Sequence, residues 1–170
     1  MIIRLEQQND TNDIRYVIER AFGQPQEANI VDNLRKNCEK LISIVALDKG
    51  KIVGHILFSP VIIEKESRLV RGMGLAPIAV LPEYQRQGIG TQLVSKGIER
   101  LRRLKCPFII VLGYPEYYSR FGFEQASRFG IYSQWKGIPD NAFMILWIDT
   151  SMKNRISGIA KYRSEFNEAI

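Results

Sequence analysis

The chain has 170 residues, about the size of one domain, and its content of 45% hydrophobic and 25% charged residues is that of an ordinary globular protein. This composition excludes the disordered and fibrous classes, and no apolar run reaches the length of a transmembrane helix. The 24 Lys and Arg residues outnumber the 18 Asp and Glu residues, which gives a net charge of +6 and points to an anionic partner.

The N-terminal half predicts one strand, two helices and a β-hairpin, in this order. These elements lie at residues 2–5, from Asp10 or Thr11 to about Phe22, from Pro25 onward, and at residues 41–47 and 52–63. In the first helix, Ile14, Val17 and Ile18 recur at helical spacing and predict a buried face. Asp48 and Gly50 separate the two β-branched runs and favour a tight hairpin turn.

The C-terminal half predicts a third strand, a long helix and three shorter elements. They lie at residues 69–80, from Gly88 to Cys106, and at residues 108–112, 115–120 and 142–148. The long helix carries an apolar stripe that includes Leu93 and Ile98, and Pro107 ends it. This order of elements is typical of an α+β protein. Residues 151–170 are open to three interpretations: a further strand, a cover over the site, or a dimer contact.

Cysteine and histidine are too scarce to build a metal site or a disulfide framework. Cys38 and Cys106 are far apart in the sequence, and free cysteines are commonly buried small apolar residues in a reducing compartment. The single histidine, His55, excludes every metal motif that needs two. With no apolar run of signal-peptide length near the N-terminus, the sequence predicts a cytoplasmic protein without a metal.

The excess positive charge is concentrated in one short segment. Residues 85–105 contain six basic residues and one acidic residue, whereas residues 1–84 contain equal numbers of both. This segment starts at a glycine-spaced turn between a predicted strand and a predicted helix. Leu93 stands where a dinucleotide-binding fingerprint needs a third glycine, and a Walker A loop needs Lys-Ser or Lys-Thr there. The turn therefore predicts a more general anion site, formed by free N–H groups at a helix start.

Three blocks of the sequence resemble one known family. The first is Ala79-Val80-x-Pro82 followed by Gln85-x-x-Gly88-x-Gly90, and the second is Tyr118-x-x-x-Gly122-Phe123. The third is the stretch of residues 54–60 on a predicted strand. Together they resemble the GNAT superfamily of N-acetyltransferases, and in particular its YhbS-like branch, over essentially residues 1–150.

The resemblance implies a GNAT acyl-CoA N-acyltransferase fold, which is an α+β fold. In this fold a mixed central sheet has helices on both faces and splays apart between its fourth and fifth strands. It also implies a single N-acetyltransferase domain over residues 1–170, with a core of about residues 1–150 and a C-terminal extension of residues 151–170.

The same resemblance implies acetyl-CoA as the co-substrate and assigns its binding residues. The pantetheine arm would lie along the fourth strand, and the pyrophosphate would rest on the N–H groups of the glycine-spaced turn. The cofactor-binding candidates are Ile78, Ala79, Val80, Gln85, Arg86, Gln87, Gly88, Ile89, Gly90 and Thr91. Many family members have an Asn at the position that Val111 occupies in this chain. The YhbS-like branch lacks this Asn as well, so the difference agrees with membership of that branch.

Two residues are candidates for catalysis by resemblance. Tyr118 matches the tyrosine that protonates the leaving thiolate, although packing under the adenosine or in the core is the alternative. Glu27 lies where the branch has an acid near the acceptor, as a base or an acceptor contact. An equal alternative is that Glu27 is an ordinary carboxylate in the first turn of a helix. In that case a chain of water molecules would serve as the base.

The implied reaction is direct transfer of acetyl from acetyl-CoA to an amine of a small molecule or protein in a ternary complex. Two functions of other classes remain as alternatives. One is a CoA-binding regulatory module without efficient catalysis. The other is nucleic-acid binding by residues 85–105, which lack interleaved exposed aromatic residues. We expect an amine acceptor as partner, no nucleic acid and no membrane, and the sequence leaves a homodimer open.

Overall fold

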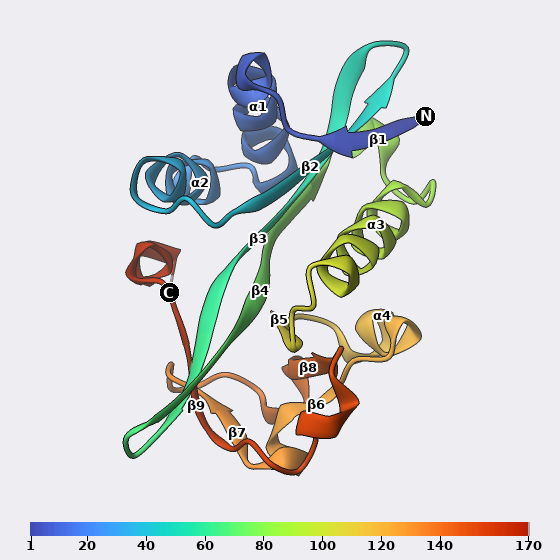
Figure 1. Cartoon of the computed structure of the whole chain (residues 1–170). Coiled ribbons are helices and arrows are strands. Elements are labelled where there is room, and N and C mark those ends of the chain that lie inside the picture. Colours follow the sequence, from blue (N-terminus) through green and yellow to red (C-terminus); the bar gives the residue numbers. More distant parts are fainter. Residues whose placement is uncertain (170) are drawn as a thin grey trace. The chain divides into compact units, whose positions relative to one another are not determined.

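The computed structural model describes residues 1–169, which form two compact units (Figure 1). The first unit contains Met1–Phe58, Ala76–Arg100 and the chain from Ser164, and the second contains Ser59–Leu75 and Leu101–Arg163. Strands β3 (Lys51–Lys65) and β4 (Arg68–Val80) each contribute residues to both units. The prediction of a single domain over the whole chain stays a prediction.

An antiparallel group of strands forms the sheet of the first unit. Strand β1 (Ile2–Leu5) pairs with β2 (Ile42–Asp48), and β2 pairs with β3. The predicted turn between β2 and β3 has two left-handed residues, Lys49 at φ 50° and Gly50 at φ 80°, which matches the twist of a tight hairpin. The predicted first strand and hairpin are therefore confirmed, with boundaries shifted by at most two residues.

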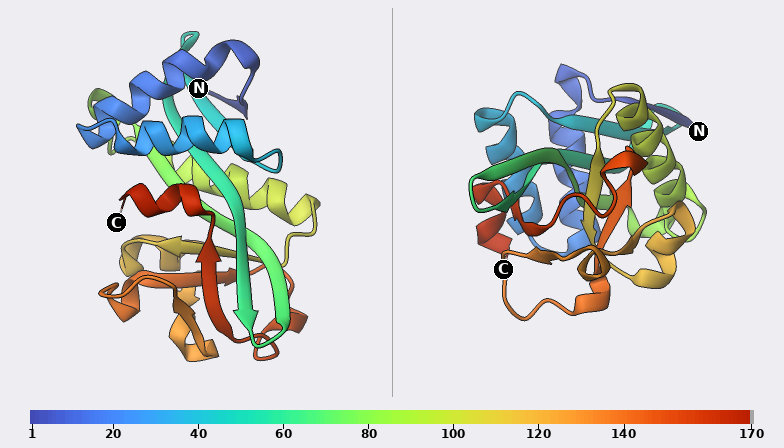
Figure 2. Two further views of the ribbon diagram at one scale, coloured as in Figure 1. Left: turned by 90° about the vertical axis from the view of Figure 1, so that its left-hand side faces the viewer. Right: turned by 60° about the horizontal axis from the view of Figure 1, so that its bottom comes forward.

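Two helices of the first unit, α1 (Thr11–Phe22) and α2 (Gln26–Asn37), lie side by side (Figure 2). Helix α1 buries the predicted apolar face and ends at Gly23, whose left-handed φ of 70° lets its N–H donate to the carbonyl of Glu19. The short C-terminal helix η7 (Ser164–Ala169) packs against α2 and buries Phe166. Part of the predicted C-terminal extension is therefore an integral part of the first unit.

Helix α3 (Ile89–Arg103) lies close to β3 because two glycines remove side chains from their interface. A Cβ at Gly54 would lie 3.1 Å from both Ile89 Cγ2 and Leu93 Cδ1. A Cβ at Gly97, in the middle of the helix, would lie 2.3 Å from the ring of buried Phe58. A glycine costs helical stability at this position, so its presence indicates a packing requirement.

Replacing Gly97 with Ala is expected to lower the free energy of unfolding by about 1–3 kcal/mol, the usual cost of overpacking a core. This cost exceeds the gain in helix propensity, which is at most about 1 kcal/mol. Urea unfolding at neutral pH measures the difference. The double variant with Phe58→Leu makes room for the methyl group and should recover part of the loss, whereas a stabilised G97A protein would contradict the packing.

The second unit contains the parallel part of the sheet. Strand β5 (Phe108–Leu112) runs parallel to β4, from Met73 opposite Ile109 to Leu75 opposite Val111. The buried strand β8 (Phe143–Trp147) is antiparallel to β5 and also pairs with the two-residue strand β6 (Glu124–Gln125). The predicted strands at residues 108–112 and 142–148 are confirmed.

The other edge of the second unit is formed by strands that the periodicity did not predict. Strand β9 (Gly158–Tyr162) is antiparallel to β3, with Tyr162 opposite Val61, and β7 (Ile131–Ser133) is parallel to β9. The strand order in this unit is thus β7-β9-β3-β4-β5-β8-β6. Helix α4 (Pro115–Tyr118) follows β5. The remaining short helices are η1 (Gln8–Asp10), η2 (Pro82–Tyr84), η3 (Ser119–Phe121), η4 (Ala126–Phe129), η5 (Asp140–Ala142) and η6 (Thr150–Met152).

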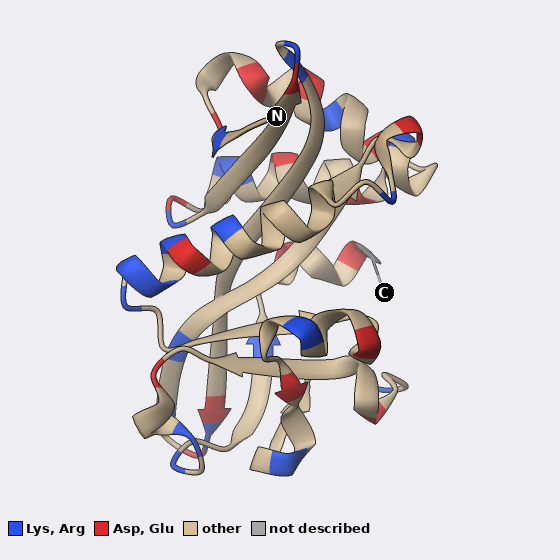
Figure 3. Ribbon diagram, turned by 90° about the vertical axis from the view of Figure 1, so that its right-hand side faces the viewer, with Lys and Arg blue, Asp and Glu red and all other residues tan. Residues whose placement is uncertain are grey.

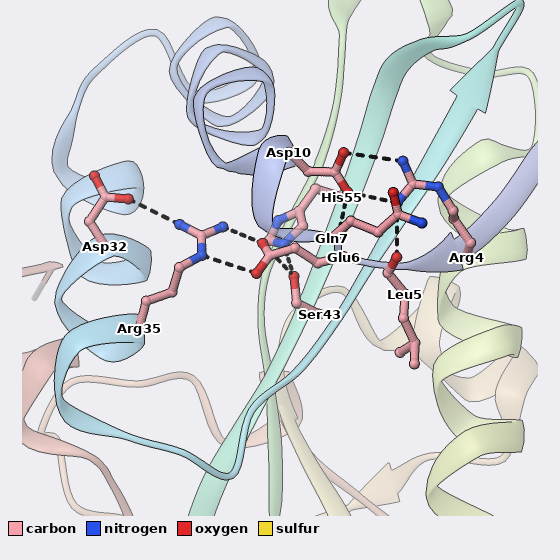
Figure 4. Close-up of polar contacts among 9 residues, drawn as sticks. All are labelled: Arg4, Leu5, Glu6, Gln7, Asp10, Asp32, Arg35, Ser43 and His55. Carbon is pink, nitrogen blue, oxygen red and sulfur yellow. Dashed lines mark hydrogen bonds and ion pairs between the residues drawn. The ribbon is translucent and has the colours of Figure 1, made fainter.

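A polar network joins Glu6, directly after β1, with β2, β3 and α2 inside the first unit (Figure 4). Two guanidinium nitrogens of Arg35 in α2 donate to the carboxylate of Glu6, and the third, Nη1, donates to Asp32 Oδ1 at 3.0 Å. Ser43 Oγ donates to Glu6 at 3.1 Å and lies 2.8 Å from His55 Nε2. Because the single hydroxyl proton of Ser43 goes to the carboxylate, His55 donates through Nε2.

His55 is fully buried, and burial together with the positive charge of Arg35 lowers its pKa to about 3. Its Nδ1 is also buried, with no hydrogen-bond partner among the described residues. A proton on Nδ1 would thus place an unpaired charge in the interior, which explains the direction of the pKa shift. The imidazole is therefore neutral at physiological pH and serves as a structural donor.

Candidate functional site

The glycine-spaced turn is held by two glutamine side chains in the first unit. Gln85 Nε2 donates to the carbonyl of Val80 at 3.0 Å, and Gln87 Nε2 donates to the carbonyl of Glu83 at 3.3 Å. Residues 85–88 are exposed. The turn is thus held by hydrogen bonds from its own side chains to the nearby backbone, and not by packing in the core.

The backbone of this turn has the form of an anion cradle. Arg86 at φ 60° and Gly88 at φ 85° are both left-handed, on either side of Gln87. Alternation of this kind turns successive N–H groups toward a common concave side. Helix α3 starts at Ile89, and its first turn contains no acidic residue that would offset the positive end of the helix dipole. Since first-turn N–H groups have no acceptor within the helix, the turn favours a phosphate.

The candidates Ile78, Ala79 and Val80 form the end of β4, in the first unit. Ala79 is buried, whereas its two neighbours are half-buried. The pairing of β4 with β5 ends at Leu75 and Val111, although β4 itself continues to Val80. Pro77, two residues after the last pair, has no N–H to donate to a neighbouring strand.

Glu27 lies in the first turn of α2 and is half-buried. Its two carboxylate oxygens accept hydrogen bonds from Gln24 Nε2 at 2.9 and 3.0 Å. This neighbour explains the orientation of the carboxylate without a ligand, and the start of a helix favours a negative charge. The contact with Gln24 therefore supports the alternative that Glu27 is an ordinary carboxylate at the start of a helix.

Tyr118 ends helix α4 in the second unit and is 7% exposed. Its ring lies against Gly113, where a Cβ would be 2.3 Å from Cε2 of the ring, and stacks edge-on with Phe123 at 5.6 Å between centroids. Burial, followed by the neighbouring Tyr117, raises the pKa of Tyr118 to about 12. The phenol is therefore protonated at neutral pH and available as a proton donor.

Sequence reasoning missed one residue near Tyr118. Burial first and the charge of Tyr118 second raise the pKa of Tyr162, a residue of β9. Tyr162 lies in the part of the chain that the sequence left without an assigned role. No periodic pattern marks it, since β9 is short and pairs with a strand about a hundred residues earlier.

The positive charge of residues 85–105 divides into two parts. Arg86 lies in the turn, whereas the other basic residues recur along α3 and gather at its C-terminal end (Figure 3). Basic side chains in the last turn of a helix interact favourably with its dipole. Lys96 also forms an ion pair with Glu99 at 3.5 Å. Most of this charge thus has a local structural explanation.

Across residues 1–169, no cluster of three or more His, Cys, Asp and Glu side chains has the arrangement of a metal site. None of the helices described is both long enough and apolar enough to cross a membrane.

Comparisons with known proteins agree on one family. A model described as an acetyltransferase (GNAT) domain matches residues 2–126. The chain is 33% identical over 168 residues to the uncharacterized N-acetyltransferase YhbS of Escherichia coli, which covers 98% of this chain and 99% of YhbS. The structure is similar to that of Escherichia coli YhbS in complex with CoA, with a TM-score of 0.91 and 32% identity over 98% of this chain and 91% of the other. It also matches a GNAT family acetyltransferase from Brucella melitensis in complex with acetyl-CoA, with a TM-score of 0.78 and 32% identity over 97% of each chain.

Proposed function

The chain belongs to the GNAT acetyltransferase family, and from this premise we propose that it transfers acetyl from acetyl-CoA directly to an amine of a small molecule or protein in a ternary complex. The GNAT fold predicted from the sequence is confirmed, including the parallel pairing of β4 with β5. The chain is accordingly an N-acetyltransferase. The acceptor, the order of steps and the roles of individual residues belong to the proposal.

The observation that carries the proposal is the backbone of the turn before α3. Left-handed Arg86 and Gly88 and an acid-free first helical turn form a cradle for a pyrophosphate. We assign residues 86–91 to this contact, and the end of β4 at Ile78, Ala79 and Val80 to the pantetheine arm. Two relatives with 32% identity are known as complexes with CoA or acetyl-CoA, which supports acetyl-CoA as the co-substrate here.

The reaction forms one bond, breaks one bond and moves one proton. The amine nitrogen bonds to the acetyl carbon, the bond from that carbon to sulfur breaks, and the sulfur takes up a proton while the nitrogen loses one. We propose that the buried neutral phenol of Tyr118 donates to the sulfur. Glu27 remains the candidate for an acceptor contact or base, and its bond to Gln24 would have to open for either role.

The first experiment separates an enzyme from a CoA-binding module. Calorimetric titration with acetyl-CoA measures binding, and thiol release with a panel of alkylamines, arylalkylamines, polyamines and a lysine-containing peptide measures turnover. We expect both binding and amine-dependent thiol release. Binding with no release on any of these amines would contradict the proposed transfer and favour the module.

A pair of glycine variants tests the cradle. Gly88→Ala is expected to weaken acetyl-CoA binding about tenfold, because a residue with a Cβ is strained at φ 85° and the turn must change shape. The matched control is Gly23→Ala, at φ 70°, where a Cβ also meets nothing within 4 Å. Both substitutions should cost similar stability in thermal unfolding. Equal acetyl-CoA affinities in the two variants would exclude the turn as the phosphate site.

A further inference from the structure

Two tyrosine rings occupy the space that two glycines leave open at the end of the β4–β5 pair, within the second unit. A Cβ at Gly74 of β4 would lie 2.9 Å from Tyr162 Cε2, and one at Gly113, directly after β5, would lie 2.3 Å from Tyr118 Cε2. Gly74 is one residue before the last pair, Leu75 with Val111. Both rings are therefore at the place where the pairing of the two strands ends.

The two rings cover opposite faces of this strand pair. Gly74 lies beside Ile110 in the parallel register, so both positions point to one face. Gly113 is three residues after Ile110, and its N–H donates to Ala142, which continues the ladder between β5 and β8. Since side chains alternate along a strand, Gly113 faces the other side. Tyr118 and Tyr162 thus approach the end of the pair from opposite faces.

Burial, and after it the charge that an ionised Tyr118 would carry, raises the pKa of Tyr162. The ring of Tyr162 also contacts the ring of Trp135, at 5.1 Å between ring centroids. Its backbone N–H donates to Gln134 Oε1 at 2.6 Å. Tyr162 is thus held in a defined position by the segment between β7 and β8.

A second polar group lies on the face of Tyr162. Ser59 of β3 is two residues before Val61, the pairing partner of Tyr162, so its side chain points to the same face. Ser59 is fully buried, and its hydroxyl has no hydrogen-bond partner among residues 1–169. A buried hydroxyl without a partner is costly, and such groups commonly meet a ligand or an ordered water.

We propose that Tyr162 and Ser59 form the acceptor side of the acetyl-transfer site, an inference that rests on the proposed function. Because Tyr118 serves the sulfur from one face, the amine reaches the acetyl carbon from the other. The phenol of Tyr162 is neutral, so its oxygen accepts a hydrogen bond from the amine N–H and orients the nitrogen for attack. The rings of Tyr162 and Trp135, with Val61, favour a primary amine on an apolar stem.

The test compares Tyr162→Phe and Ser59→Ala with the wild type by thiol release, using the amine of the panel that the wild type acetylates fastest. We expect kcat/KM for this amine to fall about tenfold in Y162F and about fivefold in S59A, as for the loss of one hydrogen bond each. The KM and the calorimetric Kd for acetyl-CoA should change less than twofold. Tyr132→Phe, at a half-exposed tyrosine of β7, is the matched control and should behave as the wild type.

The S59A variant separates an acceptor contact from a structural role. Since the Ser59 hydroxyl has no partner among the described residues, its removal should leave thermal stability unchanged or increase it, while turnover of the amine falls. Values of kcat/KM for the amine at the wild-type level in both variants would overturn this inference and leave the proposed function standing. Absence of thiol release by the wild type with every amine would overturn the proposed function, and this inference with it.

Discussion

The variant Tyr118→Phe is expected to acetylate amines at least about 100-fold more slowly than the wild type at neutral pH, with the Kd for acetyl-CoA changed less than twofold. The substitution removes one oxygen and keeps the ring that packs against Gly113 and Phe123. The steady-state rate of thiol release gives kcat, and calorimetric titration gives the Kd for acetyl-CoA. The size of the effect is that usually found when a positioned proton donor is removed.

The pKa of Tyr118 limits how this proton is used. A thiol on the Cys scale has a pKa of about 8.5, whereas burial raises the pKa of Tyr118 to about 12. A phenol of this pKa cannot remain ionised beside a neutral thiol, so its proton must be replaced from the attacking amine as the carbon–sulfur bond breaks. Tyr118 is therefore proposed as a hydrogen-bond donor that passes a proton on, rather than as a group that titrates near pH 7.

A neighbouring tyrosine provides the control for Tyr118. Tyr114 directly precedes the same short helix and is 79% exposed. The variant Tyr114→Phe therefore removes a phenol oxygen that lies at the surface and not in a buried site. It should leave kcat and the Kd unchanged. If Tyr118→Phe also retained the wild-type kcat, the packing alternative for Tyr118 would be correct and another group would have to protonate the thiolate.

Acidification from pH 7 to pH 5 is expected to lower the free energy of unfolding by about 2 kcal/mol through His55 alone. The folded chain holds the pKa of His55 at about 3, against an ordinary value of 6.5. Below pH 6.5 the unfolded chain binds a proton that the folded chain refuses, so stability falls as the pH falls. The slope is about 1.4 kcal/mol per pH unit, and it ends near the folded pKa.

Few other groups with a shifted pKa act in this window. Bonds from Arg4 lower the pKa of Asp10, so the stability that Asp10 contributes is lost only below its unfolded value of 3.8. The raised pKa values of Tyr118 and Tyr162 concern pH above 10. His55 is the single histidine of the chain. Urea unfolding at pH 7 and pH 5, followed by tryptophan fluorescence, therefore isolates its effect.

The variant His55→Gln tests the assignment, since a glutamine amide can still donate to Ser43 but does not titrate. Its stability at pH 7 is expected to be lower than that of the wild type, because the side chain packs less well in the buried space. Its stability should change much less between pH 7 and pH 5. An equal loss in the wild type and the variant would show that groups other than His55 cause the acid sensitivity.

Long elements with a clear period were predictable from the sequence. The stripe of Ile14, Val17 and Ile18 marked α1, and the Asp48–Gly50 turn marked the hairpin of β2 and β3. The turn before α3 was also predictable, because Gly88 and Gly90 stand between an apolar run and the start of the helical stripe. These features depend on residues within a few positions of one another, so a local stretch of sequence is sufficient to predict them.

The strands β6, β7 and β9 were not predictable in the same way. Strands of two to five residues are too short to show a period, and each of these forms only against a distant partner. The neutral state of His55 had no local signal either, because it depends on Ser43 from β2 and Arg35 from α2. The same is true of the ring of Tyr162 over Gly74.

By itself, the sequence determined the family, the fold class and the glycine-spaced turn that contains the first part of the concentrated positive charge. It also located most of the +6 net charge in one turn and the helix that follows, which weakens the interpretation of this charge as a nucleic-acid-binding surface. Only the tertiary structure decided which side chains lie at the end of the β4–β5 pair and from which face each approaches it. The physical reason is that a short motif sets the path of its own backbone, whereas burial, a shifted pKa and an orphaned hydroxyl such as that of Ser59 arise only when strands far apart in the chain pair.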